Sequence, residues 1–165
     1  MLKNLYLAIE RKLMAVTDGQ DQPVFKHFDL WNRQVEFIEQ ETPFNTPAVF
    51  VEFMPVGWRT DKSNTQDATL SFRLHIVTPW YANTAANVID PDIRATALEY
   101  LDIPTLVFKA LHGQPCEFGS GNFNPLHRAA SVVNHDHERF VDSVEEYRCH
   151  LKDCTCTDDS WMQGL

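Results

Sequence analysis

Basic residues are outnumbered in this sequence. The 165 residues include 14 Lys and Arg against 23 Asp and Glu, which gives a formal net charge of −9. Nucleic-acid binders usually carry a basic face that neutralises phosphates, whereas the basic residues here are scattered along the chain. We therefore expect no specific nucleic-acid partner.

Long apolar runs are also missing. No stretch approaches the roughly 20 apolar residues that a membrane-spanning helix needs. Residues 1–16 are interrupted by Glu10, Arg11 and Lys12, so they lack the apolar core of a signal peptide. The four cysteines are unevenly spaced, which argues against a secreted disulfide framework. The sequence thus predicts a cytosolic protein with reduced thiols and no membrane partner.

Familiar catalytic signatures are absent from the sequence. It contains no Gly-x-Ser-x-Gly elbow of the kind that presents a nucleophilic serine. The glycine-rich segment 119–121 has neither the spacing nor the following helix of a phosphate-binding loop. The paired carboxylates at 145–146 and 158–159 are expected to be solvated. We predict that the protein is not an enzyme, and we assign no catalytic residue, cofactor-binding residue or cofactor.

Two groups of side chains could in principle hold a metal ion. The segment His135–Glu138 combines imidazole and carboxylate ligands, but it lacks the His-Glu-x-x-His spacing and suits a hairpin turn. The second group is a single loose cluster, whereas zinc sites usually have two paired knuckles; its members are Cys149, His150, Cys154 and Cys156. We expect no metal. A small metal-dependent enzyme that uses both groups is the alternative from another functional class.

The length and composition predict one folded unit. A chain of 165 residues with 44% hydrophobic and 12% aromatic residues can build a single core without disulfides or metals. We expect a single domain over residues 1–153, followed by a short polar tail over residues 154–165.

Hydrophobic periodicity predicts seven elements, in the order helix, three strands, helix, two strands. The clearest alternation runs from Leu70 to Ile76, with Arg73 and His75 on the face opposite the apolar residues. The two strands on either side of the polar tip 57–67 are expected to pair as a hairpin. The expected bounds are 2–16 for the first helix, 24–31, 48–54 and 70–77 for three strands, about 98–111 for the second helix, and 126–133 and 139–152 for the last hairpin.

The connections complete the predicted fold. Pro104 lies within the second helical pattern, so the helix either kinks there or begins near Ile103. Segments 57–67, 80–94 and 113–125 are polar or rich in Gly and Pro and are expected to be loops. The whole pattern predicts an α+β fold, an antiparallel β-sheet with two helices packed on one face.

Large aromatic residues beside loops are the first candidates for an interaction surface. Trp58 with Arg59, and Trp80 with Tyr81, lie just beyond expected strand ends. Trp, Tyr and Arg are enriched at the energetic hot spots of protein interfaces. The alternative is that each aromatic side chain covers the edge of a small core.

The tip over residues 57–67 extends this candidate surface. Its eleven residues exceed the two to five or so that a hairpin connection needs, and extra loop length on a rigid sheet is often functional. Asp61, Lys62 and Asn64 would keep it soluble in the free subunit. We expect the tip to contact a neighbouring subunit or another component of an assembly.

Taken together, the chain resembles the tail terminator, or tail-completion, proteins of long-tailed bacteriophages and prophages of the Mu-like kind. The resemblance covers most of residues 1–153 and lies in the order of the elements. It also lies in five stretches, Phe28–Gln34, Thr46–Phe50, Leu70–Val77, Leu106–Gly113 and Asp136–Asp153. Segments 80–94 and 154–165 depart from the family and match no role in it.

The resemblance implies a virion assembly protein without catalytic residues. It would form a ring, commonly a hexamer, at the head-proximal end of the tail tube, stop tube polymerisation and offer a surface to the head. Its implied partners are further copies of itself, the tail tube protein and the head-neck connector proteins. Its implied location is the bacterial host cytoplasm during assembly and then the virion tail. A head-completion or neck connector subunit is the alternative within the same class.

Overall fold

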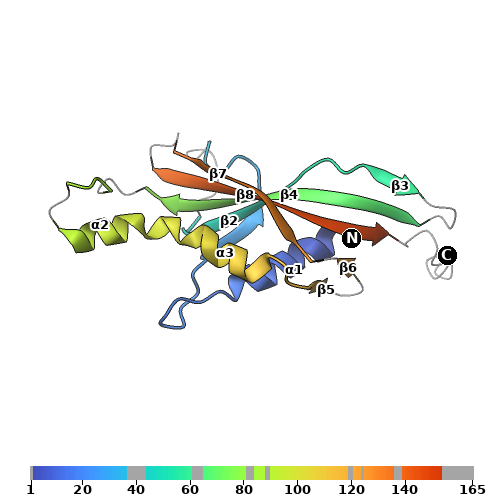
Figure 1. Ribbon diagram of the computed structural model, residues 1–165, viewed down its shortest axis with the longest axis horizontal. Coiled ribbons are helices and arrows are strands. Elements are labelled where there is room, and N and C mark those ends of the chain that lie inside the picture. Colours follow the sequence, from blue (N-terminus) through green and yellow to red (C-terminus); the bar gives the residue numbers. More distant parts are fainter. Residues whose placement is uncertain are drawn as a thin grey trace.

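Two long antiparallel strands run through the middle of the molecule. They are β4 (Gln66–Pro79) and β8 (Phe140–Asp153), and they pair without interruption from Gln66 opposite Asp153 to Pro79 opposite Phe140. Figure 1 shows both strands following the long axis of the molecule. Because side chains alternate along a strand, Leu70, Phe72 and their even-numbered neighbours on β4 all reach one face.

Shorter strands flank this central pair on both sides. The structure, a computed structural model, describes residues 2–36, 44–60, 65–80, 84–87, 90–118, 121–123, 125–135 and 139–153. In these residues the sheet has eight strands, in the order β1-β2-β4-β8-β6-β5, with β3 also on β4 and β7 also on β8. The flanking strands are β1 (His27–Leu30), β2 (Ala48–Phe53), β3 (Trp58–Thr60), β5 (Cys116–Phe118), β6 (Gly121–Phe123) and β7 (His127–Asn134).

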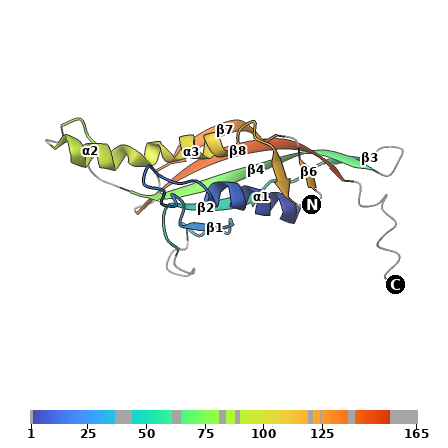
Figure 2. The same ribbon diagram turned by 90° about the horizontal axis from the view of Figure 1, so that it is seen from below.

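Two helices cover one face of the sheet. Helix α1 (Leu2–Met14) and helix α3 (Ile103–Leu111) bury their apolar stripes against the even-numbered side chains of β4 and against Tyr147, Cys149 and Leu151 of β8. A further helix, α2 (Pro91–Leu98), and a 3-10 turn, η1 (Glu99–Leu101), extend beyond the core at one end of the molecule (Figures 1 and 2). No helix in the described residues is long and apolar enough to cross a membrane.

The predicted α+β class and the helices on one face are confirmed. The hairpin of β2 with β4 and the hairpin of β7 with β8 also form where the alternation predicted them. The sheet is mixed, however, because β1 runs parallel to β2 while the other strand pairs in the described residues are antiparallel. The second helix begins at Ile103, the later of the two expected starts.

Three segments expected to be loops contain regular structure. Pro91–Leu98 is a helix because Asp90 caps it, accepting hydrogen bonds from the backbone N–H groups of Asp92 and Ile93. Its apolar pattern is weak, since only Ala97 is buried, so periodicity did not reveal it. The segment 113–125 contains the small hairpin of β5 and β6. In the tip 57–67, the three residues of β3 pair with β4.

The hydroxyl of Tyr147 is a polar atom inside the apolar core. The side chain is fully buried and its ring stacks on Phe72, with centroids 5.8 Å apart. No residue that the structure describes gives the Tyr147 hydroxyl a hydrogen bond. Burial raises the pKa of this tyrosine, and the nearby carboxylate of Glu145 raises it further. The hydroxyl therefore stays neutral, and burying it without a hydrogen-bond partner costs desolvation free energy.

Removing this hydroxyl is expected to stabilise the fold. The change Tyr147→Phe deletes a buried group without a partner and should raise the free energy of unfolding by about 1 kcal/mol. Tyr147→Leu, which also removes the ring contact with Phe72, should lower it. Both values follow from urea unfolding monitored by circular dichroism. A loss of stability in Tyr147→Phe would mean that the hydroxyl has a partner outside the described residues.

Candidate functional site

The first candidate surface is an exposed strand at one end of the sheet. Trp58 pairs with Ala68, Arg59 with Asp67 and Thr60 with Gln66, and all three β3 residues are exposed. The Trp58 side chain is 40% exposed. The tip therefore carries Trp58 and Arg59 on a strand, while Asp61, Lys62 and Asn64 lie outside the described residues.

The second candidate, Trp80, lies at the other end of β4. Its side chain is 41% exposed, and its backbone N–H donates to the carbonyl of Arg139 at 2.9 Å. The Trp80 ring meets the ring of His135 edge-on, with centroids 5.7 Å apart. Tyr81, its expected companion, lies outside the described residues.

The two exposed tryptophans do not form one surface. Trp58 pairs with Ala68, and Trp80 follows twelve residues later along the same strand direction. A strand rises about 3.3 Å per residue, so about 40 Å separates these two points. Among the described residues, one exposed tryptophan thus lies near each end of β4.

The face of the sheet opposite the helices carries a row of charged residues. Glu52 on β2, Arg73 on β4 and Glu146 on β8 are direct neighbours across the three strands. Arg73 lies between the two carboxylates, 3.5 Å from Glu52 and 3.8 Å from Glu146. Arg148 continues the row with a 3.1 Å contact to Glu146. Opposite charges facing each other across strands favour this register.

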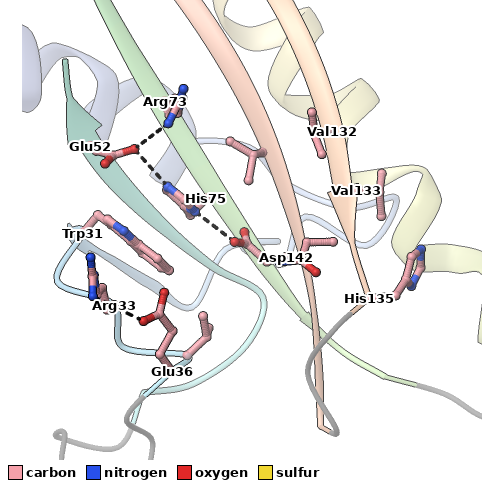
Figure 3. Close-up of a pocket in the computed structure, with 13 residues that line it drawn as sticks. Trp31, Arg33, Glu36, Glu52, Arg73, His75, Val132, Val133, His135 and Asp142 are labelled. Atoms are coloured by element: carbon pink, nitrogen blue, oxygen red, sulfur yellow. Dashed lines mark hydrogen bonds and ion pairs between the residues drawn. The ribbon is translucent and has the colours of Figure 1, made fainter.

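A nearly buried histidine extends the row toward the other end. His75 Nδ1 lies 2.9 Å from Asp142 and its Nε2 lies 3.5 Å from Glu52. The Trp31 ring stacks flat on the imidazole at 3.7 Å between centroids, with 2° between the planes. Figure 3 shows Trp31, His75 and the two carboxylates together at one side of an open depression of about 670 Å³.

The side chains at this depression connect the segment after β1 to the sheet. Its described lining residues include carboxylates and histidines but no Ser, Thr, Cys or Lys. Both nitrogens of His75 already face carboxylates. The stack of Trp31 on His75 holds the segment after β1 against the sheet, and the buried side chain of Val35 packs beside it.

The described members of the two possible metal groups do not converge. Cys149 is buried in the core, whereas the neighbouring His150 is exposed on the opposite face beside Asp67. His135 follows Asn134, which pairs with Asp142, so it lies about 23 Å along the strand from Cys149. No group of three metal-ligating side chains forms in the described part of the chain. Residues 136–138, Cys154 and Cys156 lie outside it.

Comparison with solved structures finds a chain with a similar fold in a virion. No family model matches the chain, and no curated protein matches it. Among solved structures, a chain of the virion of the native gene transfer agent (GTA) particle matches with a TM-score of 0.53 and 15% sequence identity. The match covers 90% of this chain and 95% of that chain. It establishes a shared fold over nearly the whole of both chains.

The stack on His75 gives a direct test of the structural role of Trp31. Trp31→Ala should lower the free energy of unfolding by about 2 kcal/mol, because it removes ring contacts with both His75 and Phe50. The same change at exposed Trp58 should cost less than about 0.5 kcal/mol. Thermal unfolding at concentrations where the protein is monomeric compares the two variants. Equal losses would show that Trp31 adds no particular support.

Proposed function

We propose that this protein is a structural subunit of a phage-like virion and, more specifically, the terminator that caps its tail tube as a ring. The observation that carries the proposal is the match to a chain of a gene transfer agent virion, which spans 90% of this chain. The sequence resemblance to tail terminators supplies the more specific role. No catalytic residue, metal or cofactor is part of the proposal.

The shape of the subunit supports a place in a ring. A closed ring with rotational symmetry needs two different contact surfaces on each subunit, one for each neighbour. The exposed strand β3 with Trp58 lies at one end of the long sheet and Trp80 at the other. This arrangement presents different residues to the two sides, as head-to-tail contacts require.

In the proposed role, the ring stacks on the last ring of tube protein and leaves no surface for another. Its outer face then receives the head-neck connector proteins. Assembly takes place in the bacterial host cytoplasm, and the subunit remains in the virion tail. A net charge of −9 on each subunit opposes ring formation at low salt, and screening by salt relieves that repulsion.

Self-association is the first test of this role. Native mass spectrometry across protein concentration and salt should reveal a closed oligomer, with six copies as the expected number, that becomes more populated as salt increases. Electron microscopy of purified tails incubated with the protein should place the ring at the head-proximal end of the tube. A ring found instead on the head portal would identify the neck connector alternative. A monomer under all conditions that also fails to bind tails would contradict the proposal.

The β3 strand gives a test with a matched control. The double variant Trp58→Ala with Arg59→Ala should keep the fold, because all three β3 residues are exposed. Hot-spot residues contribute about 2 kcal/mol or more each, so ring formation should weaken at least tenfold. Ile93→Ala on α2, where the side chain is 48% exposed, should leave association unchanged. In a phage that encodes the variant, tails of irregular length are expected.

Elemental analysis separates this role from the metal-dependent alternative. Purified protein should contain substoichiometric zinc and should keep its thermal transition in the presence of a chelator. Stoichiometric zinc whose removal abolishes that transition would favour a metal site built from His135 and residues outside the described part of the chain.

A further inference from the structure

The strand β7 presents an open edge to solvent. Among the described strands it pairs with β8 alone, and its residues from His127 to Val133 are all exposed. The side chain of Val132 is 62% exposed and that of Val133 is 44% exposed. From Ala129 to Val133 the strand carries no charge and no proline. At the start of β7 the backbone N–H of Arg128 donates to His112 Nδ1 at 3.1 Å, so the open part of the edge is the segment from Ala129 to Val133. An edge of this kind offers backbone groups to an incoming strand.

The edge strand β1 on the opposite side of the sheet is protected. The backbone N–H of Leu30 donates to Asp29 Oδ1 at 2.7 Å, and its carbonyl accepts from Gln34 Nε2 at 2.7 Å. These two side chains occupy backbone groups that another strand would need. Natural sheets block their edges by such means when no partner is intended. The contrast between β1 and the part of β7 from Ala129 to Val133 singles out that segment.

The open edge is also held rigidly. Glu145 on β8 accepts a hydrogen bond from the hydroxyl of Ser131 at 2.8 Å and forms an ion pair with Arg128 at 3.3 Å. The Arg128 guanidinium in turn lies over the ring of Phe108 on α3, 4.2 Å from its centroid. A strand fixed in this way loses little conformational freedom when a second strand pairs with it.

A complementary strand is present in the same chain. Four exposed large apolar side chains lie on described strands, and they belong to Leu30, Trp58, Val132 and Val133. Among the strands whose side chains the structure describes, and with β1 blocked, the exposed strand β3 with Trp58 is the other edge that carries an apolar anchor. Trp58 pairs with Ala68 and Val133 pairs with Ser143, which lies opposite Ile76, so Trp58 and Val133 lie on the same face of the sheet. Aromatic and β-branched side chains on one face are favourable partners across paired strands.

We propose that β7 accepts a strand from a second copy of this chain, and that the accepted strand is β3. The inference deepens the proposed ring by naming its subunit contact. Strand β3 lies on the β2 side of β4, and β7 lies on the far side of β8, so the two belong to opposite edges of one sheet. Pairing β3 of one copy with β7 of the next therefore continues the sheet from subunit to subunit. Such head-to-tail contacts close into a ring.

A charge on the open edge tests the contact. Val132→Lys places an ammonium group on the sheet face beside the side chains of the incoming strand and should weaken self-association at least tenfold. Leu30→Lys is the matched control, since it adds the same charge at a 50% exposed residue on the blocked edge and should leave association unchanged. Sedimentation velocity measures association, and thermal unfolding checks that both variants remain folded. Unchanged association of folded Val132→Lys would overturn the proposal.

Cross-linking identifies the partner strand even where a variant is unstable. Single variants Arg59→Cys and Val133→Cys are mixed and treated with a short bismaleimide, and peptide mapping by mass spectrometry locates the link. A link between positions 59 and 133 of different copies is expected. Arg59→Cys mixed with Leu30→Cys is the control and should give no such link. A link joining two copies of position 133 would mean a symmetric β7–β7 dimer and would overturn the choice of β3.

The outcomes also separate this contact from the proposed function. Rings that persist in Val132→Lys and still cap tails would leave the terminator role intact and remove only the β7 contact. A wild-type protein that stays monomeric at every concentration and salt would remove both. Loss of tail binding in Val132→Lys while its ring remains intact would assign β7 to the tube protein and contradict the contact between copies.

Discussion

The unbroken pairing of β4 with β8 is the interaction on which the other parts of the structure depend. It aligns the apolar side chains of both strands on one face, where α1 and α3 bury them. It also aligns Arg73 with Glu146 on the other face. Because side chains alternate with a period of two, a shift of one residue would reverse both faces at once. The core and the charged row therefore specify the same register.

This central pairing also determines where the exposed edges lie. Two shorter strands pair with the outer side of each long strand. These are β2 and β3 on β4, and β7 and β6 on β8. Most side chains of β2 are buried, whereas those of β3 and those of β7 from His127 to Val133 are exposed. The surfaces that the fold exposes are therefore backbone edges of the sheet as well as aromatic side chains.

Much of the fold was predictable because its strongest signals are local. The alternation from Leu70 to Ile76 and the helical stripe of residues 2–16 each reflect one buried face. The parallel pairing of β1 was not predictable, since register and direction depend on contacts between distant segments. Helix α2 was not predicted because its apolar pattern is weak. Its clearer signal is the N-cap residue Asp90. Of the proposed surface residues, Trp58 and Trp80 are exposed, and the sequence could not place them at opposite ends of β4. It put His75 on the polar face and could not reveal its stacking on Trp31.

The length of the central ladder has a mechanical consequence. Hydrogen bonds between antiparallel strands run across the strand direction. A pull along the long axis that holds β4 at Gln66 and β8 at Phe140, which lie at opposite ends of the ladder, therefore loads all fourteen β4–β8 residue pairs in shear at the same time. A pull across the sheet would instead separate the pairs one after another. A protein of this shape resists tension best along its own long axis, whereas copies joined edge to edge would pull across the sheet, the direction in which it is weaker.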